Sequence, residues 1–385
     1  MPDSLSLQEI IEVTYRKYKN VHEGELATYI PELSKANPDE FGVALVTAGG
    51  RVFETGHCDR LFTIQSISKP FVFGMALEEC GHERVFERVD VEPSGDAFNA
   101  IELQGGTNRP HNPMVNAGAI TVTALLHARH GAGAFAHLLH RFSALAGRRL
   151  EIDHAVYESE RSTGHRNRAI AHLLLNFGMV HDEVEAALDL YFKQCSILVT
   201  ARDLAMMAAT LSNMGCHPIT GKTALDMSCV KDVLSVMFTC GMYDYSGQWA
   251  YRVGIPAKSG VAGGVVAVVN RQLGIGTYSP RLDRFGNSVR GVEACSELAR
   301  RLGLHVFDCL NVGSSFLETV LEGGPRGRAD LQVGLPRLLA RPGGRCRRRR
   351  LSGARRDGID AQSVKLVRIN RLIPDAVPVL VDVAE

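Results

Sequence analysis

The stretch Gln65-Ser66-Ile67-Ser68-Lys69-Pro70-Phe71 connects a strand-like run to an apolar run. This order predicts a strand over residues 61–64, a short turn, and a helix over 72–80 that Gly81 terminates. Ser66 and Lys69 are three residues apart, so they share one face of a first helical turn. A serine needs a base to become a nucleophile, and a lysine can be that base when burial lowers its pKa. The stretch therefore predicts a serine–lysine pair at a helix N-terminus, whose N–H groups favour a developing anion.

Pro70 leaves two interpretations of the first turn. A proline four residues into a helix loses a hydrogen bond and crowds the carbonyl group of Ser66. Either the first turn is irregular, or regular helix begins near Lys69 with Ser68 as its N-cap. Ser68 is therefore the rival nucleophile. The S-x-x-K pattern is common and does not by itself indicate catalysis.

Composition excludes several classes of protein. The chain has 385 residues, enough for one large domain or two lobes. Lys plus Arg number 43 against 42 Asp plus Glu, so no overall charge favours nucleic acid or membrane. Nine scattered cysteines without a C-x-x-C pair predict reduced thiols in a cytoplasmic protein. The first residues lack the basic and apolar regions of a secretory signal, so we expect none, and we expect no membrane span because no apolar run is long enough to cross a bilayer.

Periodicity predicts a sheet lobe that is interrupted by a helical lobe. An amphipathic helix over 5–18 and a hairpin over 41–55 precede the serine–lysine helix. The helical lobe, about 83–240, contains candidate helices at 115–128, 134–146, 169–175, 182–194, 201–214 and 231–240. Strands at 263–270 and 272–279 and a helix at 289–302 then return to the sheet lobe, which takes in about 1–82 and 241–310. We expect an α/β (α+β) fold with a ligand site in the groove between the lobes.

The C-terminal stretch has a different composition. Residues 311–358 are rich in Arg, Gly and Pro, which predicts a disordered linker. Its arginine run at 345–350 leaves nucleic-acid binding as an alternative. Residues 359–385 regain apolar character and are interpreted as a fragment of a C-terminal regulatory module.

Two polar stretches in the predicted helical lobe are candidates for a binding site. Asn116 lies among small residues that let backbones approach closely, and a helix cap or a core amide is its structural alternative. Glu160 and Asn167 are seven residues apart and share a face if their segment is helical. The residues themselves favour a solvated loop there.

Two further stretches are candidates for catalysis. Tyr243, between glycines, is a proton relay if a lysine lies near it, and otherwise a packed aromatic. Lys258-Ser259-Gly260 opens a predicted strand, along which a ligand can lie and whose N–H groups can form half an oxyanion hole. An ordinary glycine-rich turn is the alternative.

The order S-x-x-K, tyrosine motif, K-S-G is that of penicillin-recognising serine enzymes. The amino-acid sequence closely resembles the glutaminase family of that superfamily at residues 64–70, 110–120, 240–247 and 257–264. Residues 29–31, 190–196 and 215–221 extend the resemblance, which runs from about residue 5 to about 308. It implies a β-lactamase/transpeptidase-like fold with an antiparallel sheet lobe flanked by helices.

The resemblance also implies an activity and a set of residues. The family hydrolyses L-glutamine to L-glutamate and ammonia through a serine-bound γ-glutamyl intermediate. The matching positions are, for catalysis, Ser66, Lys69, Tyr243 and Val261, and, for substrate binding, Tyr29, Ser66, Asn116, Glu160, Asn167, Tyr191, Tyr243 and Val261. Glu160 would supply the counter-charge for the substrate ammonium group.

The resemblance leads us to expect a homodimer or homotetramer without cofactor or metal, and the histidines, His111 included, show no metal-ligand spacing. A β-lactam or peptide hydrolase of the same fold is one alternative, although no S-D-N triplet is recognisable. A non-catalytic ligand-binding protein is another.

Overall fold

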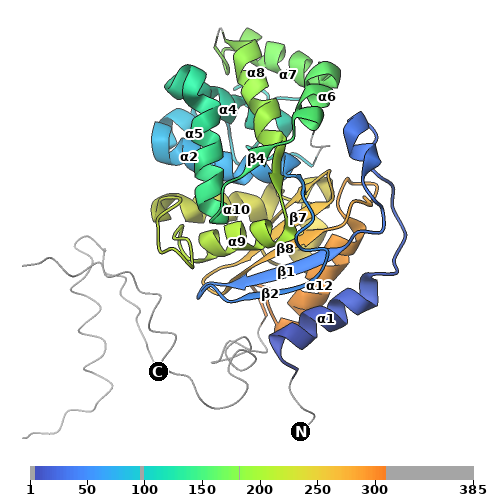
Figure 1. Ribbon diagram of the computed structural model, residues 1–385. Coiled ribbons are helices and arrows are strands. Elements are labelled where there is room, and N and C mark those ends of the chain that lie inside the picture. Colours follow the sequence, from blue (N-terminus) through green and yellow to red (C-terminus); the bar gives the residue numbers. More distant parts are fainter. Residues whose placement is uncertain (1–4, 96–98, 182, 309–385) are drawn as a thin grey trace, which may run out of the picture. The chain divides into compact units, whose positions relative to one another are not determined.

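A five-stranded antiparallel sheet lies below a group of helices in the computed structural model (Figure 1). The structure describes residues 5–95, 99–181 and 183–308, all within the compact unit Met1–Leu335. The linker and the regulatory fragment predicted for 311–385 lie outside the described residues.

The large sheet has the order β2-β1-β8-β7-β6. Its strands are β1 (Gly42–Thr47), β2 (Val52–Gly56), β6 (Ala257–Gly260), β7 (Gly264–Val269) and β8 (Leu273–Tyr278). Each neighbouring pair is antiparallel, and Gly42 of β1 pairs with Tyr278 of β8. The sheet is therefore assembled from two parts of the chain that the helices separate in sequence.

Most helices match predicted segments, but those at His82–Phe86, His154–Thr163 and Ser246–Arg252 were not predicted. The α-helices are α1 (Leu7–Tyr18), α2 (Ser68–Cys80), α3 (His82–Phe86), α4 (Asn116–His130), α5 (Ala134–Ala146), α6 (His154–Thr163), α7 (His165–Asn176), α8 (Val184–Cys195), α9 (Ala201–Ser212), α10 (Met227–Cys240), α11 (Ser246–Arg252) and α12 (Val289–Leu302). Four short 3₁₀ helices among the described residues are η1 (Pro31–Lys35), η2 (Gln65–Ile67), η3 (Gly131–Gly133) and η4 (Tyr243–Tyr245). None of the helices in the described ranges is long and apolar enough to cross a membrane.

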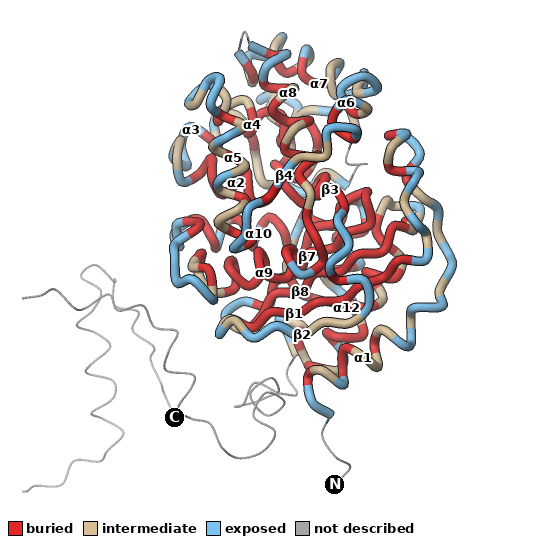
Figure 2. The backbone as a smooth tube through the Cα atoms, viewed as in Figure 1, coloured by how far each residue is buried: buried red, intermediate tan, exposed pale blue. Residues whose placement is uncertain are grey.

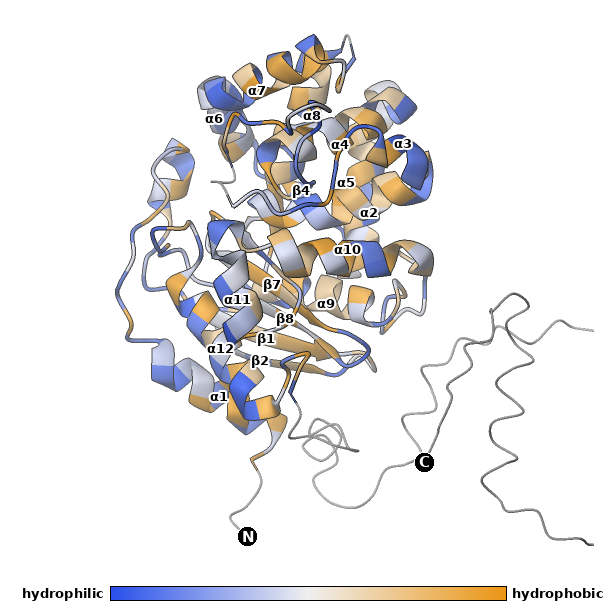
Figure 3. Cartoon of the chain, turned by 180° about the vertical axis from the view of Figure 1, so that it is seen from behind, coloured by the Kyte–Doolittle hydropathy of each residue, from blue (hydrophilic) through white to orange (hydrophobic). Residues whose placement is uncertain are grey.

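Both faces of the large sheet are covered, so β1, β7 and β8 are buried along their whole length (Figure 2). Val43 and Leu45 face one core, where they lie with residues of α1 and α12. Ala44 and Val46 face the other core, which contains residues of α9. Figure 3 shows hydrophobic strands beside helices α1 and α12 that mix hydrophobic and hydrophilic residues, as expected for helices with one solvent-exposed face.

Helix α9 packs unusually closely against the large sheet. Its residues fall within the predicted helical lobe, about 83–240. A Cβ atom on Gly274 would lie 2.3 Å from the backbone nitrogen of Ala209, and one on Gly276 would lie 2.1 Å from the carbonyl oxygen of Ala201. These β8 glycines therefore let the α9 backbone rest directly on the strand.

A second sheet connects the sheet region to the helices above it. It contains β3 (Phe62–Thr63), β5 (Ile197–Val199) and β4 (Glu151–Ile152), in the order β3-β5-β4. The strand predicted at 61–64 belongs to this small sheet. Its two partners were not predicted, because strands of two or three residues are too short to show alternation.

Replacing Gly276 with alanine tests the close approach of α9. The added methyl group meets backbone atoms, so α9 has to move away from β8. Overpacking of this kind costs about 1–3 kcal/mol, and we expect Gly276→Ala to lower the thermal unfolding midpoint clearly. Gly133→Ala is the matched control, because nothing lies within 4 Å of its Cβ position. Equal midpoints for the two variants would contradict the packing argument.

Candidate active site

The turn before α2 is irregular, which confirms the first of the two interpretations of Pro70. The 3₁₀ helix η2 precedes α2, and Gln65 adopts a left-handed backbone conformation with φ 50°. Pro70 is the third residue of α2 and is tolerated there, since first-turn N–H groups have no intrahelical partner. The alternative of Ser68 as N-cap is wrong: Ser68 is the first residue of α2, and its hydroxyl donates to the carbonyl oxygen of Gln65 at 2.8 Å.

Lys69 is fully buried, and two oxygen atoms hold its amine. Nζ donates to Oδ1 of Asn116 at 2.7 Å and to the carbonyl oxygen of Met114 at 3.1 Å. Burial lowers the pKa of Lys69 to about 8. The charges of Cys195 and Glu160 act in the opposite direction and raise this pKa, but their effect is smaller than that of burial. A neutral amine has two N–H groups and one lone pair. Two acceptors match those N–H groups, so the environment suits a lysine that takes up a proton.

Asn116 connects Lys69 to three other elements. It is the first residue of α4, and Nδ2 donates to Oδ1 of Asn167 on α7 at 2.8 Å. The hydroxyl of Tyr191 on α8 donates to Oδ1 of Asn116 at 3.4 Å. The predicted residues Asn116, Asn167 and Tyr191 are thus brought together with Lys69.

Tyr243 contacts Ser66 of the η2 turn and has a strained backbone conformation. Its φ is 57°, and its hydroxyl donates to the carbonyl oxygen of Ser259 at 2.9 Å. Burial raises the pKa of the Tyr243 phenol, while a hydrogen bond with the Ser66 side chain lowers it. The contact brings the predicted proton relay to the predicted nucleophile.

Lys258 is a buried lysine that the sequence analysis did not place among the site residues. Its Nζ lies 3.9 Å from the centre of the Tyr243 ring and donates to the carbonyl oxygen of Ser259 at 2.8 Å. Burial lowers the pKa of Lys258 well below its usual range, and the charge of Lys69 lowers it further. The Lys-Ser-Gly motif marked this stretch as a candidate for catalysis, and the packed fold brings its lysine to Tyr243.

A cavity of about 230 Å³ lies over Ser66. It is lined by six predicted residues: Tyr29, Ser66, Asn116, Glu160, Asn167 and Tyr191. Val261 lines a neighbouring cavity instead, together with Ala262 and Tyr278. Tyr29 is 56% exposed as a residue, yet burial raises the pKa of its phenol, and the charges of Tyr243 and Glu160 raise it further.

Glu160 corrects the solvated loop that the residues favoured, because it is buried on α6. Its Oε2 atom is buried and has no hydrogen-bond partner within the described residues. Burial raises the pKa of Glu160 to about 8, while the charge of Lys69 and a hydrogen bond from Gln65 lower it. A buried carboxylate oxygen without a partner is costly, so this atom indicates a cationic ligand group.

Glu160 and Asn167 do not share one helix face, since the chain breaks at Gly164 between α6 and α7. A Cβ atom on Gly164 would lie 2.7 Å from the carbonyl oxygen of Glu160. The glycine lets the two helices meet closely enough for both side chains to line one cavity.

Seven more residues line the cavity and were missed as site residues, among them Gln65, Arg166 and Cys195. Gln65 contacts both Thr63, at 3.2 Å, and Glu160, and its place directly before Ser66 was a usable signal. Arg166 donates to the carbonyl oxygen of Asn99 at 2.6 Å and brings a positive charge to the cavity. Cys195 lies in the stretch 190–196 that extends the family resemblance, and its place four residues after Tyr191 was a usable signal.

A family model described as Glutaminase matches residues 24–307. The chain belongs to the glutaminase family. It is 55% identical over 311 residues to the glutaminase of Nostoc sp.. The aligned region covers 80% of this chain and 92% of the Nostoc protein. The chain is 47% identical over 326 residues to the glutaminase of Corynebacterium glutamicum, which covers 84% and 78% of the two chains.

Solved structures show the same fold. The chain matches the structure of Mglu in its glutamate form with a TM-score of 0.76 and 44% sequence identity. The match covers 80% of this chain and 71% of the Mglu chain. The chain matches the probable glutaminase ybaS at TM-score 0.76 and 39% identity, over 78% and 98% of the two chains. The predicted class, a mixed helix and antiparallel-sheet fold, is therefore confirmed.

The two serines of the turn give opposite predictions. Ser66→Ala removes the hydroxyl that lines the cavity, so we expect ammonia release from glutamine to fall to background with the thermal midpoint kept. Ser68→Ala removes contacts to Gln65 and to Gln194, whose Nε2 donates at 3.3 Å, but leaves the cavity lining unchanged. It should keep most of the activity. The reverse pattern would move the nucleophile to Ser68.

The pH profile follows from the two groups whose pKa values lie near 8. Lys69 takes up a proton only when it is neutral, and Glu160 binds a cation only when it is ionised; both conditions hold above about pH 8. We expect kcat/KM to fall below pH 8 with a slope steeper than one, because two protons bind. In Glu160→Gln only one proton binds, so the acidic side of the plot of log kcat/KM against pH should have a slope of one. The fall should also occur at lower pH, because the carboxylate that raises the Lys69 pKa is gone. A slope of one in both the parent chain and the Glu160→Gln variant would contradict the prediction that Lys69 and Glu160 both titrate in this range.

Proposed function

We propose that this member of the glutaminase family hydrolyses the side-chain amide of L-glutamine to L-glutamate and ammonia, with Ser66 as nucleophile. The observation that carries the proposal is one small cavity lined both by Ser66 and by the partnerless Oε2 of Glu160. Glutamine offers an amide for the first group and an ammonium for the second. Similarity to Mglu, which was solved in its glutamate form, supports the same ligand class.

The first half of the reaction forms an ester. Lys69 takes the proton of Ser66, and Oγ attacks the amide carbon of glutamine to form a tetrahedral intermediate. The Ser66 N–H lies in the first turn of η2, where helical N–H groups lack intrahelical acceptors. Together with the Val261 N–H it would hold the oxyanion. In support, Gly260, next to Val261, packs so closely on the turn that its Cβ would lie 3.0 Å from the carbonyl oxygen of Ile64.

Departure of ammonia needs a proton on the leaving nitrogen. Tyr243 supplies it, supported by its contact with Ser66, and is reprotonated from the ammonium of Lys69. The carbon–nitrogen bond then breaks and leaves a γ-glutamyl ester on Ser66. Water attacks this ester with Lys69 again as base. Collapse of the second intermediate breaks the bond between carbon and Oγ, the Lys69 ammonium returns a proton to Ser66 Oγ, and glutamate is released.

Recognition of the substrate uses the other cavity residues. Ionised Glu160 binds the α-ammonium through Oε2. Amide and phenol donors from Asn167, Tyr191 and Tyr29 would bind the α-carboxylate, and Arg166 adds a positive charge to the same lining.

An ammonia-release assay on pure protein tests the function. We expect turnover of L-glutamine and poor turnover of L-asparagine, whose shorter side chain misplaces the reacting carbon by about 1 Å, a displacement that can cost on the order of 100-fold. No ammonia from glutamine would favour a ligand-binding protein. Acylation of Ser66 by benzylpenicillin without glutamine turnover would favour a β-lactam hydrolase.

Glu160→Gln tests the recognition of the ammonium group. The variant keeps the shape of the side chain but loses a charged hydrogen bond worth about 1.5–3 kcal/mol, so kcat/KM for glutamine should fall roughly 10- to 150-fold. For 4-carbamoylbutanoate, which lacks the α-amine, little loss is expected. Glu158→Gln on the exposed face of α6 is the control. Equal loss on both substrates would mean that Glu160 does not bind the ammonium.

A cytoplasmic location and assembly as a homodimer or homotetramer complete the proposal. The location is supported by seven free cysteines among the described residues, as expected of a reducing compartment. The assembly is supported by the family resemblance alone, and light scattering measures it directly.

A further inference from the structure

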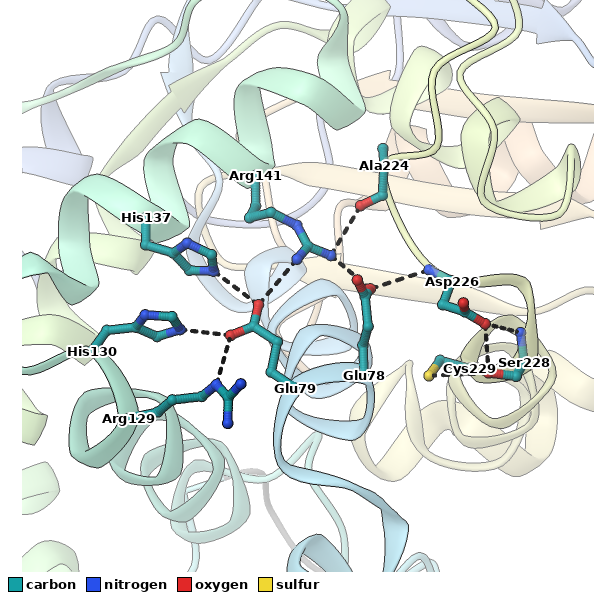
Figure 4. A network of polar contacts seen from close by, with 10 residues as sticks. All are labelled: Glu78, Glu79, Arg129, His130, His137, Arg141, Ala224, Asp226, Ser228 and Cys229. Atoms are coloured by element: carbon teal, nitrogen blue, oxygen red, sulfur yellow. Dashed lines mark hydrogen bonds and ion pairs between the residues drawn. The ribbon is translucent and has the colours of Figure 1, made fainter.

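Two histidines and a glutamate meet far from the cavity, at the opposite ends of the helices that carry the site. Nε2 of His130 lies 2.6 Å from Oε2 of Glu79, and Nε2 of His137 lies 2.8 Å from Oε1. The two imidazole rings stack at 4.0 Å with an angle of 19° between their planes. Figure 4 shows both rings pointing their Nε2 atoms at the same carboxylate.

The three side chains form a compact set of metal ligands. Their donor atoms all lie within 4.8 Å of one another. Ligands on a tetrahedral zinc ion lie roughly 3.3 Å apart, given zinc–nitrogen distances of about 2.0–2.1 Å. Small shifts therefore make room for the ion, and neutral imidazole with carboxylate is a ligand set that suits zinc.

The surroundings favour an ordered site that solvent can reach. Arg141 donates from Nη1 to Oε1 of Glu79 at 3.0 Å and from Nη2 to Oε2 of Glu78 at 2.7 Å, which holds the Glu79 carboxylate toward the histidines. Such outer contacts orient metal ligands. The side chains of His130 and His137 are 24% and 29% exposed, so an ion can enter and keep a water as fourth ligand.

We propose that Glu79, His130 and His137 form a zinc-binding site that cross-links α2, α4 and α5. Without the ion, each Nε2 carries the proton that it donates to the carboxylate. On zinc binding each Nε2 gives up that proton to solvent and binds the ion through its lone pair, and each neutral imidazole carries its one proton on Nδ1. The site is structural or regulatory, because a helical rise of about 1.5 Å per residue places Glu79 roughly 15 Å along α2 from Lys69.

The expectation of no metal followed from sequence spacing, and spacing alone does not find this cluster. Glu79 lies on α2, His130 ends α4, and His137 lies on α5. The packing of α2 and α5 against α4 brings the ligands together. The inference stands apart from the proposed function, since none of the three residues lines the cavity over Ser66.

Titration of the chelator-stripped full chain with Zn²⁺, followed by calorimetry and by thermal unfolding, tests the site. We expect one saturable equivalent and a midpoint that rises with zinc concentration. Loss of an outer-shell partner typically weakens metal sites 10- to 100-fold, so His130→Ala and His137→Ala should each weaken zinc binding at least about 100-fold. Their glutaminase activity without zinc should match that of the parent chain, which shows that both variants are folded.

His82→Ala is the matched control, because His82 also pairs with a carboxylate, Asp232 at 2.7 Å, but outside the cluster of three possible ligands. It should bind zinc like the parent. Cobalt substitution should give a spectrum without a thiolate charge-transfer band, since Cys80 next to Glu79 is not a ligand. Anomalous diffraction from zinc-soaked crystals of the unaltered chain places the ion directly. No saturable binding, equal binding by both histidine variants, or a thiolate band would overturn the proposal.

Discussion

An amine buried away from bulk solvent has to be neutral or well paired, and two neutral oxygen atoms accept hydrogen bonds from Lys69. Both acceptors come from the start of α4, so that segment must come very close to α2. Gly118 lets the loop before α4 fold closely onto the start of that helix, because a Cβ there would lie 2.0 Å from the carbonyl oxygen of Asn112. The low pKa of Lys69 and the position of Asn116 thus have one common cause in the packing of α2 against α4. The same packing brings His130, at the far end of α4, to Glu79 on α2.

Two of the five non-glycine residues with positive φ in the described ranges lie beside Ser66. Gln65 and Tyr243 both adopt positive φ angles without being glycine, which costs on the order of 1–3 kcal/mol each. Contacts nearby offset the cost: Ser68 holds the Gln65 carbonyl group, and the Tyr243 hydroxyl is held by Ser259. A relaxed turn would aim Ser66 elsewhere, so the strain belongs to the positioning of the proposed nucleophile.

Sequence reasoning predicted the long elements and missed short and tertiary ones, for physical reasons. Helices α5 and α12 have the predicted bounds, because each buries one stripe of apolar residues. The break at Gly164 and the burial of Glu160 depend on Phe192 and other groups distant in sequence, so local pattern suggested a loop. The order of the motifs along the chain predicted that Ser66, Lys69 and Tyr243 belong to one catalytic site. It did not indicate Lys258 as a neighbour of Tyr243, because only the packed fold stacks that amine on the ring.

The pairing of β1 with β8 has a consequence for how the chain reaches its native state. Gly42 pairs with Tyr278, so the central ladder joins residues from nearly opposite ends of the described chain. Contacts this distant in sequence slow folding, because loop-closure entropy must be overcome first. During synthesis β1 leaves the ribosome long before its partner exists. Until β8 arrives, an apolar strand with an open edge is exposed to aggregation, and the helices between them have time to form first.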